Sequence, residues 1–590
     1  MPAGRSWHRQ ARHTDIKEGT VTQVVLERAR ARRLSLLLVS LVVLSVVALI
    51  LIVPGVSAAP RSSAVKTGGT LKIEMPWGTM PDNFNPLTSQ GSQAGGTLSC
   101  LYEQLFYFNS ATSKLKYMLG TSYKWKNRNR TLVVGTRPNV KWTDGKAFSA
   151  ADVAFTFNYV KANPSVDVNG IWSGTTLSSV KATGTNQVTF KFSKPDTPAL
   201  VIFASQFIVP QHIWASINNP ATASNTSPVG TGPFTMDSYS PTTIVYKKNS
   251  HYWMKGHPYV AQVLMTAVKS NDTALLDLIN NNIQYTYDAI TNPAKTYSAK
   301  DPAHLKYWWP VNNDNFLIFN TKKAPYNNAK FRKALAWGLN TKLIAKRAYF
   351  GAIPASTGVA ETGAIPGQIP SWINGKPLKP LQWKYSVSKA KSLLAKAGYK
   401  LKGGKLTMPN GQAIPSQTIL IGGPGWTDYI TIAQMISQNL KALGISSSII
   451  QAPWATYSGN LPAAKYDMAV SWAWGASGGP SPYFIYYYNF AKAQIAGKTN
   501  MSRYTSKTIE KALAKYAASS DPKVQKAAVQ AMAKNLMTKV PVIPITARTN
   551  FFDYNSKTFT GWPNAKHPYN AGEAPDNPGG KLVLINVHLK

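Results

Sequence analysis

Residues 140–157 read VKWTDGKAFSAADVAFTF, a stretch that combines a tight turn with the start of a helix. Thr143-Asp144-Gly145 is typical of a turn, because an Asp before a Gly satisfies local backbone donors. Ser149 predicts the helix start, and Asp152 three residues later forms a variant of the capping box. The apolar residues that share one face of this helix are Val153, Phe157 and Val160. We therefore expect a strand, a turn and a capped helix in this order, with Asp144 in a structural rather than a catalytic role.

Strands and helices alternate along the rest of the chain. Alternating apolar residues predict strands within 68–78, 187–193, 242–249, 260–270 and 541–547. Helical spacing predicts helices at 327–351, 386–399, 508–519 and 521–540, and a helix, a glycine stop and a strand within 428–450. The first of these is expected to be one continuous helix that stops at Gly351. Helices and strands are mixed throughout, so the sequence predicts an α/β body.

The order of these elements and seven short motifs resembles the family 5 extracellular solute-binding proteins, the peptide/nickel class of receptors that serve ABC importers. The resemblance runs from about Gly69 to the C-terminus. The stretches that carry it are GGTLKI (68–73), LYEQLF (101–106), the opening motif (140–157), VGTGPFTMDSY (229–239), FLIFNTKKAPYNNAKFRKALAWGLN (316–340) with FGAIPAS (350–356), AKSLLAKAGY (390–399) and YDMAVSWAWG (466–475). Any one of them alone is weak, but seven in the family's order make an accidental similarity improbable.

The resemblance implies an α/β, two-lobed, periplasmic-binding-protein-like fold with hinge strands and an extra domain inserted in lobe one. Lobe one would comprise 69–98, 226–312 and 541–590, the extra domain 99–225, and lobe two 313–540. Strands in DNFLIFNT (314–321) and PVIPITA (541–547) would cross between the lobes. Such proteins close around a ligand held between the lobes by a hinge motion.

A basic segment and then an apolar segment open the chain. Four arginines within 28–33 precede an uncharged run over 34–60, whose apolar part is long enough to match a bilayer. We interpret 1–33 as a basic N-terminal segment and 34–60 as a signal peptide or membrane anchor, with small residues at 56–59 that suit cleavage. The rest of the chain is therefore expected to be exported, to the periplasm or to the extracellular face of the cell membrane.

The chain is strongly basic, with a formal net charge of +41. The first 60 residues contribute 8 Lys and Arg and 3 Asp and Glu, so the remainder still carries +36. The lysines are scattered, and no helix-turn-helix, zinc-finger or RNA-binding signature is present. We therefore expect a solvated basic surface and no nucleic-acid partner, while adhesion to anionic wall polymers or lipid would depend strongly on salt. Cys100 is the only cysteine, which excludes an intrachain disulfide.

Enzymatic signatures are missing from the sequence. The eight His residues, including His251 and His257, have no metal-ligand spacing. Neither a Gly-x-Ser-x-Gly elbow, nor a His-Glu-x-x-His motif, nor a phosphate loop is present. We therefore expect a binding protein with no catalytic residue, no metal and no cofactor. A secreted hydrolase is the alternative from a different functional class.

Residues 472–490 read WAWGASGGPSPYFIYYYNF and contain eight aromatic residues but no ionisable acid or base. Aromatics fill cores, yet rings in a Gly- and Pro-rich loop can also line a binding site. The resemblance implies that this stretch is a ligand-contacting loop of lobe two, where many peptide-binding members have a Trp and an Asp. Trp472 and Trp474 are present, but no acid occurs between Asp467 and Glu510. A buried ammonium without a carboxylate is costly, so a free peptide N-terminus must be met elsewhere, or the ligand is uncharged at that end.

Further candidate residues come from both lobes. The run Tyr486–Tyr488 is expected on a strand, which would send alternate side chains inward. The arginine that receives a peptide carboxylate in some family members has no identifiable counterpart. The complete set of candidate ligand-binding residues is Trp472, Trp474, Tyr483, Trp454 and Trp426 in lobe two, with Trp77, Asn83 and Asn85 in a first-lobe loop.

These observations predict a receptor rather than an enzyme. We expect a monomer that captures an oligopeptide-like solute between its lobes and delivers it to an ABC permease in the membrane. An oligosaccharide is the alternative ligand within the same mechanism, because sugar faces can lie against Trp and Tyr rings. A micromolar site requires only about 8 kcal/mol of net binding free energy, which a few stacked rings and hydrogen bonds can provide.

Overall fold

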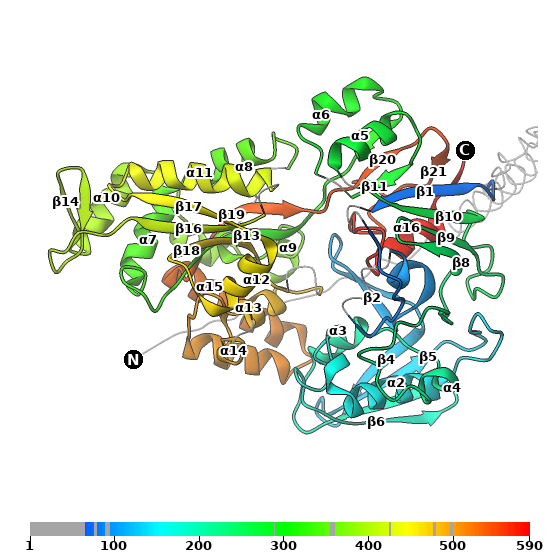
Figure 1. The fold of residues 1–590 in the computed structure, drawn as a ribbon. Helices are drawn as coiled ribbons and strands as arrows, with labels where there is room; N and C mark the ends of the chain where they lie inside the picture. The colour runs from blue at the N-terminus through cyan, green and yellow to red at the C-terminus, as the bar shows by residue number, and fades with distance from the viewer. Residues whose placement is uncertain are drawn as a thin grey trace, which may run out of the picture. The chain divides into compact units, whose positions relative to one another are not determined.

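A computed structural model describes residues 65–75, 79–88, 95–268, 270–287, 289–353, 360–423, 426–475, 479–495 and 499–590. The expected basic segment at 1–33 and the expected signal peptide or anchor at 34–60 lie outside this range. No helix within the described part is long and apolar enough to cross a membrane. Residues 66–590 form one unit (Figure 1).

A seven-stranded sheet gathers strands from distant parts of the chain. Its order is β12 (Leu305–Tyr307), β20 (Asp553–Asn555), β11 (Tyr285–Thr286), β1 (Thr70–Met75), β10 (Gln262–Ala267), β9 (Thr243–Lys248) and β8 (Phe234–Ser240). The parallel pairing of β1 with β10 sets Leu71 opposite Val263 and Ile73 opposite Met265, and all four are buried. The alternation that predicted strands β1, β9 and β10 therefore reflects one face packed into the core.

A four-stranded antiparallel sheet follows the order β4 (Gly120–Lys126), β5 (Thr131–Thr136), β7 (Gln187–Phe192) and β6 (Leu177–Gly184). Helix α2 (Ala150–Ala162) packs on it, with the rings of Phe157 and Phe190 4.9 Å apart. Ser149 and Asp152 form the predicted capping box. The Oδ1 atom of Asp144 accepts a bond from the N–H of Lys146 at 3.1 Å, as expected for a turn.

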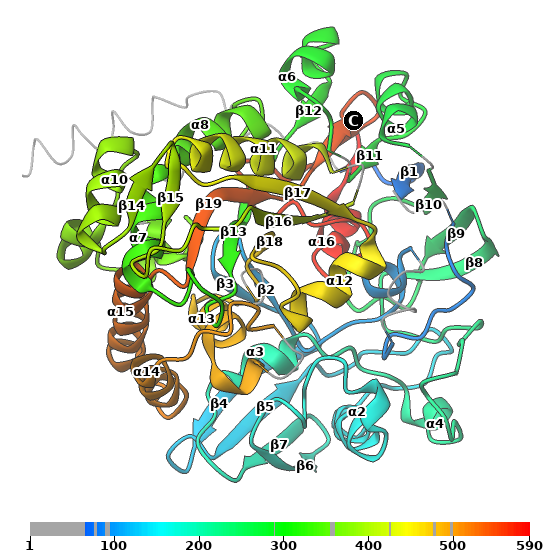
Figure 2. The same ribbon diagram turned by 60° about the vertical axis from the view of Figure 1, so that its left-hand side comes forward.

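A five-stranded sheet has the order β17 (Ser447–Ala452), β16 (Gln417–Gly422), β18 (Met468–Trp472), β13 (Val311–Phe319) and β19 (Val542–Thr549). Helices α8 (Thr341–Ala348) and α11 (Thr427–Lys441) run along one side of it (Figure 2). The helices α13 (Tyr483–Phe490), α14 (Lys507–Ala517) and α15 (Pro522–Lys539) lie on the other side in the same view.

The remaining elements are short connections and helices. The strands are β2 (Phe106–Asn109), β3 (Lys114–Tyr117), β14 (Lys400–Lys402), β15 (Lys405–Thr407), β21 (Phe559–Thr560) and β22 (His588–Leu589). The helices are α3 (Ala199–Ala204), α4 (Gln211–Trp214), α5 (Asn271–Ile279), α6 (Pro293–Thr296), α9 (Ile369–Trp372), α10 (Val387–Lys396), α12 (Trp454–Ala463) and α16 (Gly580–Asn586).

Two predictions of local structure were wrong. The continuous helix expected over 327–351 is divided into α7 (Ala329–Gly338) and α8, because Asn340 accepts a bond from the N–H of Leu343 and caps a new helix. The run Tyr486–Tyr488 lies on helix α13 rather than on a strand. Its rings therefore follow helical spacing, which leaves Tyr486 fully buried and Tyr487 and Tyr488 half-buried.

Two antiparallel crossings connect the seven-stranded and five-stranded sheets. Strand β12 continues into β13, and β19 continues into β20, so the two connections run side by side. The N–H of Trp308 donates to the carbonyl of Phe552 at 2.8 Å, and the N–H of Asn550 donates to the carbonyl of Pro310 at 3.2 Å. The hinge strands expected from the sequence are β13 and β19, whereas the residue boundaries of the lobes and the extra domain stay a prediction.

The motif VGTGPF packs against the short π-helix Thr97–Leu101. A Cβ atom on Gly230 would lie 1.9 Å from the carbonyl oxygen of Leu101, and one on Gly232 would lie 2.2 Å from that of Cys100. Only glycine therefore allows this approach of two backbones. Cys100 itself is fully buried in the core beneath this contact.

Candidate functional site

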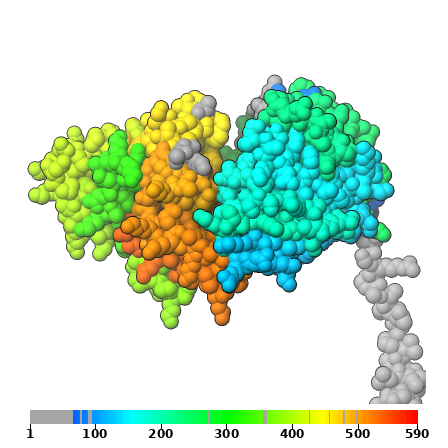
Figure 3. Space-filling model, turned by 90° about the horizontal axis from the view of Figure 1, so that it is seen from below, coloured from blue at the N-terminus to red at the C-terminus, as the bar shows by residue number. Residues whose placement is uncertain are grey.

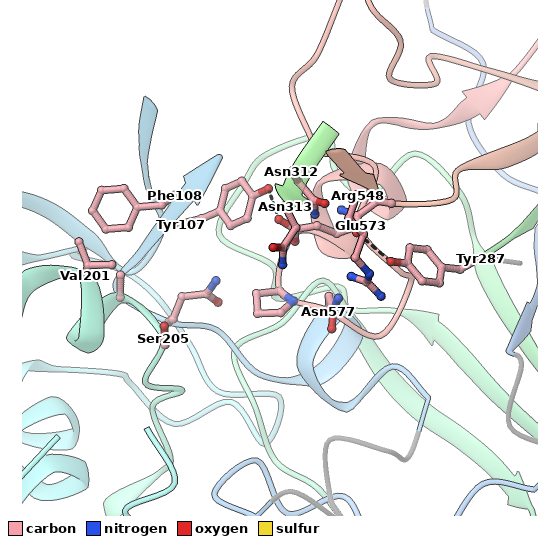
Figure 4. A pocket seen from close by; sticks show the side chains of 14 residues that line it. Tyr107, Phe108, Val201, Ser205, Tyr287, Asn312, Asn313, Arg548, Glu573 and Asn577 are labelled. Atoms are coloured by element: carbon pink, nitrogen blue, oxygen red, sulfur yellow. Dashed lines mark hydrogen bonds between the residues drawn. The ribbon is translucent and has the colours of Figure 1, made fainter. Parts of the chain in front are cut away.

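Two adjoining cavities meet at Arg548, close to the crossings between the sheets. The larger has a volume of about 1120 Å³ and the smaller a volume of about 320 Å³. Tyr287, Arg548 and Asn577 line both of them. Figure 4 shows the smaller cavity, with Arg548 beside Asn312 and Asn313 at the start of β13.

The larger cavity is lined from both sides of the hinge. The side of the seven-stranded sheet contributes Asp272, Tyr287, Ile290, Thr291, Phe551 and Asp576. The side of the five-stranded sheet contributes Gly423, Trp426, Thr427, Asp428, Tyr429 and Trp454. A cavity of this size with apolar walls and a few charged groups is typical of a ligand site.

Arg548 is the cationic group of this cavity. It lies on β19, where it pairs with Asn313 of β13, and its side chain is half-buried. Burial alone would lower the pKa of its guanidinium, but the nearby Tyr429, Tyr287, Tyr349 and Asp428 outweigh burial and raise it. No carboxylate in the described part of the chain forms an ion pair with Arg548. The side chain therefore presents a permanent, unpaired charge to the cavity.

Two acids from the loop before α16 line the cavities near Arg548. Glu573 accepts bonds from the hydroxyl of Tyr107 at 2.9 Å and from the N–H of Gly579 at 2.8 Å. The Oδ1 atom of Asp576 has no hydrogen-bond partner among the described residues. Burial raises the pKa of the Glu573 carboxyl to about 7, and burial together with the neighbouring Glu573 raises that of Asp576 to about 7. Each acid therefore holds its proton to a higher pH than an exposed carboxyl does.

A third acid faces the larger cavity from the first turn of α11. Asp428 accepts a bond from the hydroxyl of Tyr349 at 3.2 Å. Burial raises the pKa of its carboxyl, while Arg548 and the bond from Tyr349 act in the opposite direction. Asp428 and Asp576 thus supply carboxylates on two walls of one cavity.

Four of the predicted tryptophans form one aromatic cluster beside the larger cavity, and we call Trp426, Trp454, Trp472 and Trp474 the tryptophan cluster. The rings of Trp454 and Trp472 lie nearly parallel with centroids 6.1 Å apart. Trp426 and Trp474 lie 6.3 Å and 5.4 Å from Trp472, and the Cζ atom of Arg548 lies 5.6 Å from the Trp472 ring. The structure therefore brings together residues that are up to 48 positions apart in the sequence.

Residues 114–495 match the family described as bacterial extracellular solute-binding proteins, family 5 Middle. This match spans more than half of the chain. The chain belongs to this family. Its role is therefore that of a solute-binding protein. The family is extracellular or periplasmic, in agreement with the expected export.

Known proteins resemble this family 5 protein in sequence and in fold. The dipeptide-binding protein of Escherichia coli is 26% identical over 453 residues, which cover 73% of this chain and 80% of the relative. The periplasmic oligopeptide-binding protein of an oligopeptide ABC transporter from Thermotoga maritima has a TM-score of 0.80 at 24% identity, covering 88% of this chain and 99% of that one. The mannohexaose-bound form of that protein has a TM-score of 0.74, covering 88% and 98%.

Three other predicted residues of this family 5 protein, Tyr483, Asn83 and Asn85, do not line the two cavities. Tyr483 is buried on α13 and stacks on Tyr516 with centroids 4.4 Å apart. The amide of Asn85 is fully buried and donates to the carbonyls of Pro220 at 2.7 Å and Ala223 at 2.9 Å. The Oδ1 atom of Asn83 accepts a bond from the N–H of Asn85. Trp77 lies outside the described residues.

Sequence reasoning missed the charged residues of the site. Arg548 directly follows the stretch PVIPITA, which was predicted as a crossing strand. A lone arginine at the end of an apolar hinge strand is a signal that could have identified it. Asp576 and Asn577 lie in a Gly- and Pro-rich loop near the C-terminus, where nothing in the local pattern marks them.

Another contact missed from the sequence lies outside the cavities. The carboxyl of Asp144 bonds His212 at 2.7 Å, and this partner holds the pKa of Asp144 below its usual value despite the opposing effect of desolvation. The pair ties the turn at Asp144 to α4. It strengthens the structural role that the sequence predicted for Asp144.

Proposed function

We propose that this protein captures an oligopeptide-like solute with a free carboxylate in the larger cavity and delivers it to the membrane permease of its importer. The observation that carries the proposal is Arg548, an unpaired cation on the wall of a cavity of about 1120 Å³. The guanidinium forms no ion pair among the described residues, so a ligand carboxylate can accept two parallel hydrogen bonds from it.

The charges of the cavity also fit the other end of a peptide. The loop after β18 contains no acid, so it cannot meet a terminal ammonium. Asp428 and Asp576 line the cavity from opposite sides of the hinge and are the carboxylates available for this role. The hydroxyls of Tyr287 and Tyr429 donate to other side chains but can still accept a bond from the peptide backbone, and Asn577 adds an amide group.

The tryptophan cluster favours an oligosaccharide as the second candidate ligand. Sugar rings present apolar faces that pack on Trp, and the relative from Thermotoga maritima has been found with mannohexaose. Such a ligand would leave Arg548 without a counter-ion, which is why we place it second.

We further propose that the protein acts as an exported monomer. Two lobes that are joined by β13 and β19 can close on each other by a hinge motion. A ligand that contacts both lobes stabilises the closed state, because it binds that state more tightly than the open one. The permease would then receive the closed, loaded form.

Mass spectrometry of the solute that co-purifies with the protein, followed by calorimetric titration, tests the proposal. We expect trialanine to bind with a dissociation constant in the micromolar range, and mannohexaose to bind far more weakly. Arg548→Met should weaken the binding of trialanine, whereas the control Arg347→Met, which removes the same charge from the exposed surface of α8, should leave binding unchanged. Tight binding of mannohexaose together with no binding of trialanine would show that the ligand is an oligosaccharide and not a peptide. Turnover of either solute would support the hydrolase alternative instead.

A further inference from the structure

A third cavity, of about 250 Å³, lies beside the tryptophan cluster, and we call it the side cavity. It shares Trp454 with the larger cavity, so the two adjoin at this residue. Its wall consists of Trp454, Tyr457, Ser458, Leu461, Pro462, Trp472, Trp474, Thr499 and Met501. The side cavity contains no charged residue, in contrast to the larger cavity.

The hydroxyl groups on this wall are already used within the protein. Tyr457 donates to the carbonyl of Val470 at 2.8 Å, and Thr499 donates to the carbonyl of Tyr488 at 2.7 Å. Water in the side cavity would therefore find few partners, although an ordered water normally makes about three hydrogen bonds. A ligand group that displaces poorly bonded water gains affinity when it is apolar.

The size and shape of the walls favour a ring. An apolar cavity of about 150 Å³ in another protein holds benzene, so about 250 Å³ is enough for one aromatic side chain. Trp454, which is 54% exposed, and Trp472 offer nearly parallel faces for stacking. Buried Leu461 and Met501 complete an apolar wall.

We propose that the side cavity is a specificity subsite that takes one aromatic side chain of the bound peptide, while Arg548 holds the peptide's carboxylate in the adjoining cavity. This inference rests on the proposed function, because it assumes that the ligand is a peptide. A sugar unit fits the side cavity less well, since its several hydroxyl groups would lose water, whereas the Nε1–H of Trp474 is the one buried side-chain donor on the described wall that lacks a partner. The subsite would make this receptor selective among peptides of equal length and charge.

The test compares tripeptides by calorimetric titration. The probes are trialanine, the three peptides in which one alanine is replaced by phenylalanine, and the three in which it is replaced by glutamine. We expect the best phenylalanine peptide to bind roughly 10- to 100-fold more tightly than trialanine, as burial of one aromatic side chain predicts, and the glutamine peptides to show no such gain.

Two variants and a matched control locate the effect. Ser458→Phe places a ring in the side cavity, and Trp474→Ala removes part of its wall, so each is expected to bring the phenylalanine-to-alanine affinity ratio near one. Thr456→Phe adds the same ring to an exposed position of α12 and should keep the wild-type ratio. Circular dichroism confirms that each variant is folded.

The possible outcomes separate the two proposals. If the wild type binds phenylalanine peptides and trialanine equally, or if Ser458→Phe and Trp474→Ala both keep the wild-type ratio, the subsite is refuted while peptide capture stands. If the wild type binds none of the tripeptides, peptide capture fails and the subsite fails with it.

Discussion

Replacement of Arg548 by methionine separates ligand recognition from folding. Methionine keeps much of the length of the side chain and removes the charge that lines both cavities. Two unit charges about 4 Å apart attract each other by about 4 kcal/mol at the effective dielectric of a partly buried site. Desolvation of the ligand carboxylate and ordering of the side chains offset part of this attraction. We expect a net loss of about 2 to 3 kcal/mol, or roughly 30- to 150-fold in affinity, for trialanine.

The assay is a double-mutant cycle measured by calorimetry. Trialanine and its C-terminal amide are each titrated into the wild type and into Arg548→Met. The amide lacks the carboxylate, so it should bind the wild type about as weakly as trialanine binds the variant, and the variant should not distinguish the two. The coupling energy between residue and carboxylate is then about 2 to 3 kcal/mol.

Folding should respond differently from binding. Arg548 has no ion pair among the described residues, so its removal leaves no carboxylate without a partner. Only the attraction to Asp428 and the contact with the Trp472 ring are lost, so the free energy of unfolding of the ligand-free protein should fall by no more than about 1 kcal/mol. An equal loss of affinity for trialanine and its amide, or no loss for either, would refute the assignment of Arg548 to the ligand carboxylate.

Two further predictions concern stability. The pKa of Glu573 and of Asp576 is about 7 in the folded protein and about 4 in the unfolded protein. Between these pH values the folded state therefore holds more protons than the unfolded state. The free energy of unfolding thus falls as pH rises from about 4 to 7. Each group contributes at most about 1.4 kcal/mol per pH unit, and Asp576→Asn should reduce this slope in urea titrations from pH 4.5 to 8. Gly230→Ala should lower the free energy of unfolding by about 3 kcal/mol or more, because its Cβ atom would meet the carbonyl oxygen of Leu101 at 1.9 Å. Urea denaturation measures this loss.

Each stability prediction has its own check. A slope in Asp576→Asn equal to that of the wild type would show that Asp576 does not release its proton in this pH range. For the glycine contact, Gly459→Ala in α12 is the control, since a Cβ atom there has nothing within 4 Å and should stabilise the helix by up to about 1 kcal/mol. Equal stability of Gly230→Ala and the wild type would contradict the close approach of the two backbones.

The parts of the fold that depend on neighbouring residues were predicted from the sequence. The capping box of Ser149 and Asp152 is a contact between residues three positions apart, so local chemistry determines it. The division between α7 and α8 is also local, but the helical spacing of apolar residues continues across it. Asn340 was the decisive residue, and its preference for a helix cap outweighed that spacing.

The candidate site was predictable only in part. The tryptophans were identified by composition and by the resemblance, and four of them do form one cluster. Tyr483 is aromatic like the tryptophans, but its ring stacks on Tyr516. Its place on helix α13 determines this packing, and the composition of the sequence does not reveal it. Arg548, Asp428 and Asp576 come together only through the pairing of distant strands, which no local pattern encodes.

The buried position of Cys100 makes this receptor suitable for spectroscopic labelling without prior mutation of its native thiol. Cys100 is the single cysteine of the chain, it is fully buried, and burial raises the pKa of its thiol well above the usual range. A thiol that is both inaccessible and protonated reacts slowly with maleimide dyes. Cysteines introduced at exposed positions on either side of the hinge would therefore take up dyes selectively, and energy transfer between them would report lobe closure on single molecules.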